Sequence, residues 1–325
     1  MIKILSIDGG GVRGIIPAIV LAEIERRTRK PICELFDLIA GTSAGGILAL
    51  GLVVPEEGDA ISCIPRYTAK TLAKLFKNDA HIIFDKSILF RIPGGRYVYR
   101  RYPDDGMEFV LEKYFKDAMI SESLTDVLIP SYEIQLRSPA FFKSAKVKSE
   151  QPTQMDVLMR DVARATSAAP TYFTPERIET LPELAFIDGG VYANNPAMCA
   201  YAEAKAIFQE ETDFLVVSLG TGEANAPIPY EEAVHWGHIG WSRRMLNIIM
   251  DGSSDSVDYQ LKQIVTPRKG EDRYYRFQTE LGKDTEPIDN SDPFNMEKLE
   301  ALGIGIIRNR DNQLKLDKLC EQLLE

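Results

Sequence analysis

Several residue types are scarce in this chain of 325 residues, and each scarcity excludes a class of protein. The chain has three histidines and four cysteines, with no C-x-x-C pair and no cluster of histidines. This pattern argues against a structural zinc site or a disulfide framework. We therefore expect no metal site and reduced thiols in a cytoplasmic protein, at Cys33, Cys63, Cys199 and Cys320.

Long apolar runs are also missing. The longest, residues 15–22 and 47–54, fall well below the ~20 residues that a membrane-spanning helix needs. No basic and apolar leader precedes the first predicted strand, so export is not expected. If the protein meets a membrane, the sequence predicts contact from outside.

Positive charge is outnumbered by negative charge. The chain has 38 Lys and Arg residues against 48 Asp and Glu residues, a net charge of −10. A general nucleic-acid binder carries the opposite sign, so no nucleic-acid polymer is expected as a partner. With 45% hydrophobic and 26% charged residues, the composition is that of a globular protein with a sizeable core.

Strand and helix patterns alternate from the start of the chain. Residues 3–7 predict a short buried strand, residues 9–14 a tight turn, and residues 15–29 a helix. This alternation predicts an α/β fold whose mostly parallel sheet is covered by helices on both faces. The unit repeats with a strand over 35–40, a turn over 41–46 and a helix start over 47–54, and further strands are expected over 128–135, 184–187 and 214–219.

The first glycine-rich turn, residues 8–14, reads DGGGVRG and formally satisfies G-x-G-x-x-G. A dinucleotide site would need an acidic residue at the end of the second strand, whereas Asp37 lies near its beginning. Asp8 would also repel a pyrophosphate. The loop offers unpaired backbone N–H groups at a helix N-terminus, which suit fixed or developing negative charge.

The second glycine-rich turn, residues 41–45, reads GTSAG between a predicted strand and a predicted helix. A G-x-S-x-G in that context predicts a nucleophile elbow, with Ser43 exposed on a strained turn. A third turn places Asp188 at a strand end before two glycines. Asp188 alone reads most simply as a turn residue that caps the next helix. A catalytic role for Asp188 is favoured only in combination with Ser43, because a serine nucleophile needs a base.

Histidine is the alternative base. His235 or His238 after Asp188 would complete the order of an α/β-hydrolase triad. That fold usually places more strands between its oxyanion loop and its elbow than this chain does. Both histidines flank Trp236 in an amphipathic segment, which favours a structural or interfacial role. The third histidine, His81, lies far from either motif in the sequence.

As a set, these motifs resemble the patatin-like phospholipase family. Residues 8–14, 41–46 and 188–190 carry the resemblance, and 165–173, 192–196 and 218–222 support it, in family order over about residues 2–265. The resemblance implies a three-layer α/β/α patatin-like fold. It also implies a lipid acyl hydrolase with a Ser-Asp dyad and with no histidine, metal or cofactor in the reaction.

Carried over by position, the resemblance makes Ser43 the nucleophile and Asp188 the general base. The amides of Gly10 and Gly11 would form the oxyanion hole, helped by Arg13. The remaining motif positions are Gly9, Gly14, Gly41, Gly45, Gly189 and Gly190. The expected activity is that of a phospholipase A or esterase acting on phospholipid or another acyl lipid, in peripheral contact with a membrane.

A second resemblance concerns regulation. Bacterial relatives of this compact pattern include phospholipase effectors that cyclic nucleotides activate in phage defence. Residues 86–101 contain five basic residues and no acidic one, after an apolar stretch. This segment reads either as a lid or interfacial patch or as an ordinary insertion on the core. Its candidate contacts to a lipid head group or a nucleotide activator are Arg96, Arg100 and Arg101.

The predicted organisation is one catalytic domain over residues 1–265, with an insertion or lid at about 70–105. Residues 266–325 form an extension packed on the same domain, with a helix over 313–324 that docks. Residues 236–250 are a second candidate surface, with Trp241, Met245, Ile248 and Ile249 at helical spacing, although a buried amphipathic helix is the preferred interpretation. An actin-like sugar kinase or ATPase stays open as a rival, because residues 8–11 and 220–222 resemble phosphate-binding loops. A homo-oligomer is also left open.

Overall fold

The computed structural model describes residues 1–325 except 58–63, 86–100, 146–155, 225–226 and 269. Its main sheet follows the order β4-β3-β2-β1-β6-β8, with β5 beside β3. Neighbours from β3 to β8 along this path are parallel, whereas β4 and β5 run antiparallel to β3. The strands are β1 Ile2–Ile7, β2 Leu38–Gly41, β3 Asp126–Glu133, β4 Ser138–Lys143, β5 Phe186–Asp188, β6 Phe214–Leu219 and β8 Tyr274–Phe277, and β7 Glu223–Ala224 pairs with β9 Glu280–Leu281 in a small second sheet.

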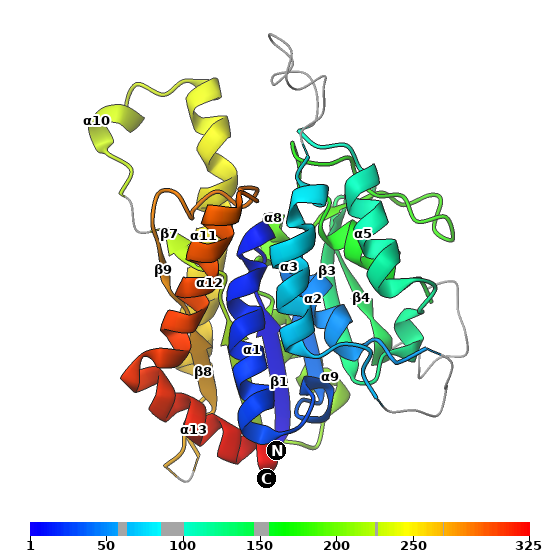
Figure 1. The fold of residues 1–325 in the computed structure, drawn as a ribbon, viewed down its shortest axis with the longest axis vertical. Coiled ribbons are helices and arrows are strands. Elements are labelled where there is room, and N and C mark those ends of the chain that lie inside the picture. The colour runs from blue at the N-terminus through cyan, green and yellow to red at the C-terminus, as the bar shows by residue number, and fades with distance from the viewer. Residues whose placement is uncertain (58–63, 86–100, 146–155, 225–226, 269) are drawn as a thin grey trace.

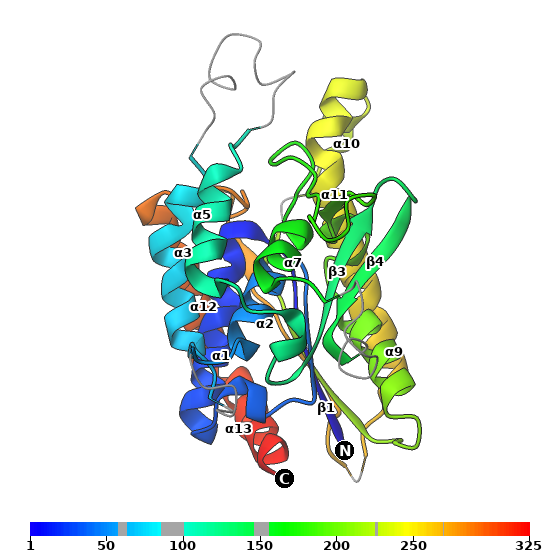
Figure 2. The same ribbon diagram turned by 90° about the vertical axis from the view of Figure 1, so that its right-hand side faces the viewer.

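Helices cover both faces of this sheet, as Figure 2 shows with the sheet seen nearly edge-on. One face carries α1 Ile15–Thr28, α2 Ala44–Val53, α3 Ala69–Ile83, α5 Asp105–Phe115, α7 Met159–Thr166, α12 Pro293–Arg308 and α13 Arg310–Leu324. The other carries α9 Ala197–Ile207 and α11 His238–Ile264. Shorter elements are α8 Gly190–Ala193, α10 Tyr230–Ala233 and the 3-10 helices η1 Gly11–Gly14, η2 Ile32–Glu34 and η4 Ile120–Glu122.

The alternation of strand residues produces these layers. In β1, Leu5 packs into the larger core cluster, with α1 and α2, while its neighbour Ile4 packs into the second cluster, with α9. Successive strand side chains point to opposite faces, so a fully apolar strand needs helices on both sides. The expected three-layer α/β/α arrangement with a mostly parallel sheet is confirmed.

Element boundaries differ from the prediction where turns intervene. The second strand begins at Leu38 rather than at residue 35, because residues 32–34 form η2. The first glycine turn contains η1, which runs directly into α1. Both differences arise at short 3-10 turns, which leave no apolar periodicity for a sequence pattern to detect.

The helix expected over residues 236–250 exists as the first half of α11, but its predicted burial is wrong. Trp241, Met245, Ile248 and Ile249 are 39%, 47%, 40% and 42% exposed. These turns of α11 stand beyond the ends of the parallel strands, together with α10 (Figure 1). Because none of the described helices or strands of the sheet layers covers this part of α11, its apolar side is exposed.

The loops that follow β1, β2 and β6 meet at the carboxyl edge of the parallel sheet, which is the usual ligand-binding edge of open α/β folds. Both sequence motifs with the strongest chemical content, DGGGVRG and GTSAG, lie there. Within the described ranges, no helix combines the length and the apolarity that crossing a lipid bilayer requires.

Candidate active site

Ser43 lies on a sharp turn between β2 and α2. Its φ of 54° and ψ of −124° are unusual for a residue with a side chain, as a strained elbow requires. The turn is tight because a Cβ at Gly41 would lie 2.1 Å from the carbonyl oxygen of Gly45, and a Cβ at Gly45 would lie 2.3 Å from that of Ile7. The glycines two before and two after Ser43 therefore let strand and helix approach.

The hydroxyl of Ser43 meets the carboxylate of Asp188. Ser43 Oγ donates to Asp188 Oδ2 at 2.7 Å, and the other carboxylate oxygen accepts from the amide of Gly190 at 2.7 Å. Asp188 ends the short strand β5, which pairs antiparallel with Ser131 to Glu133 at the carboxyl end of β3, and β3 runs parallel to β2. A serine and a base within hydrogen-bond reach are the minimal arrangement for nucleophilic catalysis.

Burial makes Asp188 a stronger base than a free aspartate. Its side chain is 5% exposed, and the loss of hydration raises its pKa to about 6, although hydrogen bonds from Ser43 and Gly190 oppose the rise. A base is most effective when its pKa approaches the working pH. The environment of Asp188 therefore supplies what the residue type alone lacks.

Gly10 and Gly11 line the same cavity as Ser43. Among the described residues, none accepts a hydrogen bond from the amide of Gly10 or Gly11, whereas Gly9 donates to Asn194 O and Val12 donates to Ile288 O. Gly11 has a φ of 57°, which favours glycine. Free amides at the start of a helical segment suit an oxyanion.

Arg13 lies behind this loop. It is 6% exposed, its Nε donates to the carbonyl oxygen of Gly10 at 3.3 Å, and it lines a separate polar pocket with Asp8 and Asp251. Arg13 is not among the residues that line the Ser43 cavity. In this geometry Arg13 acts on the backbone of the glycine loop rather than on a group inside the cavity.

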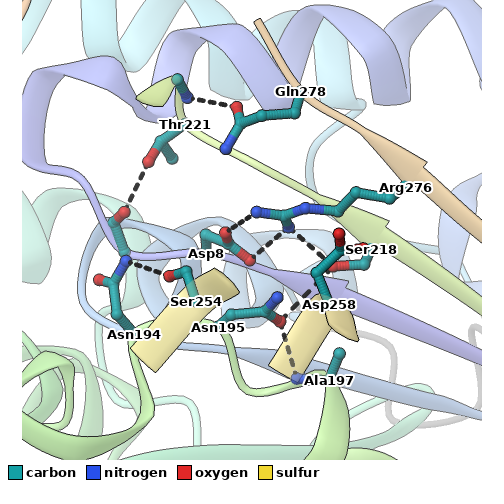
Figure 3. A network of polar contacts seen from close by, with 12 residues as sticks. Asp8, Asn194, Asn195, Ala197, Ser218, Thr221, Ser254, Asp258, Arg276 and Gln278 are labelled. Carbon is teal, nitrogen blue, oxygen red and sulfur yellow. Dashed lines mark hydrogen bonds and ion pairs between the residues drawn. The ribbon is translucent and has the colours of Figure 1, made fainter. Parts of the chain in front are cut away.

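A buried ion pair fixes the start of the glycine loop, as Figure 3 shows. Arg276 on β8 binds both carboxylate oxygens of Asp8, at 3.0 and 2.6 Å, and also donates to Ser218 Oγ. Thr221 Oγ1 donates to the carbonyl oxygen of Gly9 at 2.6 Å. Asp8 therefore has a structural role in this arrangement. The loop is held by Thr221 after β6 and by Arg276 on β8, which are 212 and 268 residues from their partners in the sequence.

Sequence reasoning assigned no role to two residues that support the site. Thr166 Oγ1 accepts a hydrogen bond from the amide of Ser43 at 3.0 Å, which holds the elbow. Arg276 lies outside every motif, and it is 268 residues from its partner Asp8. Thr166 lies in residues 165–173, a stretch that supports the family resemblance. Arg276 lies in no motif, so no sequence pattern near it indicated its role.

The cavity above Ser43 is lined almost entirely by apolar side chains. They come from α2, α3, α11 and the loops before β5 and α12, and include Ile47, Leu75, Phe76, Ile83, Phe84, Phe173, Met250 and Ile288. An apolar lining with a few polar groups at one point suits a long hydrocarbon chain that carries one reactive ester. No histidine belongs to the described lining, and His81 and His235 are exposed.

Of the three arginines predicted to contact a head group or nucleotide, Arg96 and Arg100 lie outside the described residues. Arg101 forms an ion pair with Asp289, and its guanidinium lies 5.0 Å from the ring centroid of Tyr172. Because Tyr172 lines the cavity, Arg101 is near the site but already has an acidic partner.

Comparisons with known proteins show the family to which the chain is similar. A family model described as Patatin-like phospholipase matches residues 5–201. Patatin-like protein 2 of Arabidopsis thaliana is 32% identical over 99% of this chain and 86% of its own length. Patatin-like protein 1 of the same plant is 30% identical over 98% and 84%. Patatin-04/09 of Solanum tuberosum is 30% identical over 95% and 84%.

Solved structures also match this chain. VipD from Legionella pneumophila aligns with a TM-score of 0.42 and 12% identity, over 94% of this chain and 67% of that chain. A likeness at this level carries no argument about the site. The sequence comparisons, by contrast, include the glycine loop, the elbow and the aspartate turn within their matched range.

Proposed function

The chain belongs to the patatin-like phospholipase family, whose activity is lipid acyl hydrolysis, and we propose that it cleaves fatty acyl esters through an acyl-serine intermediate on a Ser43–Asp188 dyad. The observation that carries the proposal is the 2.7 Å hydrogen bond from Ser43 Oγ to Asp188. It lies in an apolar cavity beside the amides of Gly10 and Gly11, for which the described residues offer no acceptor. The substrate class is phospholipid or a related acyl lipid.

The first half of the reaction forms the acyl-enzyme. Ser43 Oγ attacks the ester carbonyl carbon while its proton passes to Asp188. The carbonyl oxygen becomes an oxyanion, which accepts hydrogen bonds from the amides of Gly10 and Gly11. The carbon–oxygen bond to the alcohol then breaks, and the alcohol leaves with the proton from Asp188.

The second half regenerates the enzyme. Asp188 takes a proton from a water molecule, whose oxygen attacks the acyl carbon of the ester on Ser43. The second oxyanion uses the same two amides, and its collapse releases a fatty acid and returns the proton to Ser43 Oγ. Asp188 is the only proton carrier in either half, so its pKa sets the pH dependence of both.

We expect kcat/KM to rise as pH increases through about 6 and to level off above it. Only the ionised carboxylate of Asp188 accepts a proton, and burial raises its pKa to about 6. An unperturbed aspartate would place the rise near 3.8. A pH–rate profile with a dissolved short-chain ester measures the position of this rise.

A histidine would titrate in the same range, so the control is the double variant His235→Gln with His238→Gln. The dyad predicts that this variant keeps both the rise and the rate within a few-fold of wild type. A fall on the order of 10³-fold, typical of losing a catalytic base, would replace the dyad with a triad.

Residues 266–325 belong to the same catalytic unit in this proposal, as an extension packed on residues 1–265. Support comes from β8, which pairs with β6 in the central sheet, and from Arg276, which binds Asp8. The insertion or lid proposed at about 70–105 begins within α3, whose Phe76 and Ile83 line the cavity. Residues 86–100 of that segment lie outside the described part of the chain.

The resemblance to bacterial phospholipase effectors also predicts that a cyclic nucleotide activates this protein. The assay that tests it is hydrolysis of phospholipid vesicles by the wild-type protein, with and without a panel of cyclic di- and trinucleotides. Release of fatty acid that requires one of these nucleotides would support the prediction. Equal rates with and without the panel would show a constitutive enzyme.

A further inference from the structure

An exposed apolar patch covers α10 and the first turns of α11. We call it the arm patch and define it by its described apolar side chains, which are between 39% and 75% exposed: Tyr230, Val234, Trp241, Met245, Ile248 and Ile249. Figures 1 and 2 both show this part of the chain beyond the end of the sheet. Clustered apolar side chains of this size on a surface mark an interaction site.

The spacing of the patch is that of one helix face. Trp241, Met245, Ile248 and Ile249 follow the i, i+4, i+7, i+8 pattern, which in most helices faces the protein core. Here the same pattern faces outward, because α11 has passed the end of the sheet. The stripe is therefore unpartnered within the described chain.

The charges around the patch favour a lipid surface. Within the patch, α10 carries Glu231 and Glu232, whereas the α11 stripe from Trp241 to Ile249 contains two arginines and no acidic residue, on a chain of net charge −10. Trp236 packs edge-on against Trp241 at 5.3 Å between ring centroids, and the Arg244 guanidinium lies 4.5 Å from the Trp236 ring. Tryptophan and arginine beside an apolar helix face are typical of segments that lie in the membrane interface.

The patch continues into the catalytic cavity. Met250, the residue after the stripe, is 8% exposed and lines the cavity that contains Ser43. Val191 on α8 lines the cavity as well, and α8 contacts α11. An apolar surface outside the cavity thus connects with an apolar wall inside it along one helix.

We propose that the arm patch docks on the surface of a phospholipid bilayer, so that an acyl chain can pass along α11 over Met250 to Ser43. The proposal rests on the proposed function for the identity of the substrate. It assigns the membrane contact to α10 and α11 rather than to the basic segment 86–101. Glu231 and Glu232 lie on α10 between Tyr230 and Val234 of the patch, and Asp251 follows the stripe on α11.

The tryptophans offer a direct test, because the chain contains only two and both, Trp236 and Trp241, lie in this part of the chain. The Ser43→Ala protein is mixed with vesicles of phosphatidylcholine, alone or with phosphatidylglycerol. We expect the tryptophan emission to shift to shorter wavelength and to be quenched by lipids with brominated acyl chains. Emission that stays unchanged at saturating lipid would overturn the proposal.

A charge-insertion variant tests the patch itself. The double variant Met245→Glu with Ile248→Glu should weaken vesicle binding by a factor on the order of ten or more, because two carboxylates would enter an apolar interface. Its matched control is Ile264→Glu with Leu314→Glu, which adds the same charge at exposed apolar positions elsewhere. The control should bind vesicles like wild type. If both variants lost vesicle binding equally, the added negative charge alone would explain the loss, and the proposal for the patch would fail.

Activity separates this proposal from the proposed function. On an active background, the patch variant should lose hydrolysis of vesicles and keep hydrolysis of a dissolved short-chain ester. If the wild type cleaves the dissolved ester but binds no vesicles, the docking surface fails and the dyad stands. If it binds vesicles but cleaves neither substrate, the dyad fails and the surface stands.

A second copy of the chain is the competing occupant of the patch. Light scattering of the wild type and of the patch variant decides between them. If the wild type is a dimer, the patch variant is a monomer and neither binds vesicles, the arm patch is a surface for self-association. A monomer in both cases leaves the lipid surface as the occupant.

Discussion

Replacing Ser43 with alanine is expected to reduce ester hydrolysis by on the order of 10⁴-fold or more, because it removes the hydroxyl that is hydrogen-bonded to Asp188. Asp188→Asn should cause a loss of similar size, since the amide cannot take the proton that Ser43 Oγ releases. Initial rates with an activated short-chain ester measure both.

The double variant tests whether the two residues act as one unit. If they do, Ser43→Ala with Asp188→Asn should be no slower than the slower single variant, because the second change removes a group that already lacks its partner. Multiplying losses would mean that serine and aspartate act separately. A near-wild-type rate in either single variant would remove the dyad.

The control for these variants is their unfolding temperature, which shows whether they are folded. Burial raises the pKa of Asp188, so the ionised carboxylate is costly to bury, and Asp188→Asn should unfold at the same temperature as wild type or higher. A fluorophosphonate probe should label wild type at Ser43 alone. Labelling at another serine would contradict the nucleophile assignment.

Gly11→Ala is expected to reduce kcat by ~10²–10³-fold with little change in KM. Gly11 has a φ of 57°, and a Cβ there would lie 2.0 Å from the carbonyl oxygen of Ile288, a backbone atom that cannot move aside cheaply. The loop must shift, and its amides then no longer point at the oxyanion. Because this charge exists only in the transition state, kcat falls more than KM rises.

Gly305→Ala is the matched control for that change. Gly305 lies within α12 and has open space around its Cβ position, so alanine should leave kcat unchanged and stabilise the helix by up to ~1 kcal/mol. Thermal unfolding of both variants separates a damaged loop from a damaged fold. The rates are compared per folded molecule.

Calorimetry with ATP tests the rival interpretation of the glycine loops. If wild type bound ATP tightly, and Gly11→Ala lost that binding while it hydrolysed ester normally, the loop would be a phosphate cradle. The ion pair between Asp8 and Arg276 already gives the loop carboxylate a structural partner. An esterase defect without any ATP binding supports the oxyanion hole.

Much of the candidate site could be predicted from the sequence because its parts are local. The elbow around Ser43 depends on glycines two residues away, and the loop at Gly10 and Gly11 depends on the backbone freedom of adjacent positions. Such short-range steric requirements appear directly in the order of residues. The alternation of strands and helices is local in the same way, and it predicted the layers.

Other features depend on contacts that no local pattern encodes. Asp188 reaches Ser43 only because β5 pairs with β3, and spacing alone could not distinguish it from a turn residue. Its raised pKa follows from burial by distant segments. Arg276 meets Asp8 across almost the whole chain, which only the order of strands in the sheet brings about.

The first half of α11 separates the two kinds of information most clearly. The sequence by itself determined that residues from Trp241 to Ile249 form a helix with one apolar face, because the period of a helix is set by its own backbone. Whether that face meets the core or water was decided by the tertiary structure, in which the helix runs past the end of the sheet. A hydrophobic pattern records which side avoids water, whereas only the packed fold determines what is available to cover it.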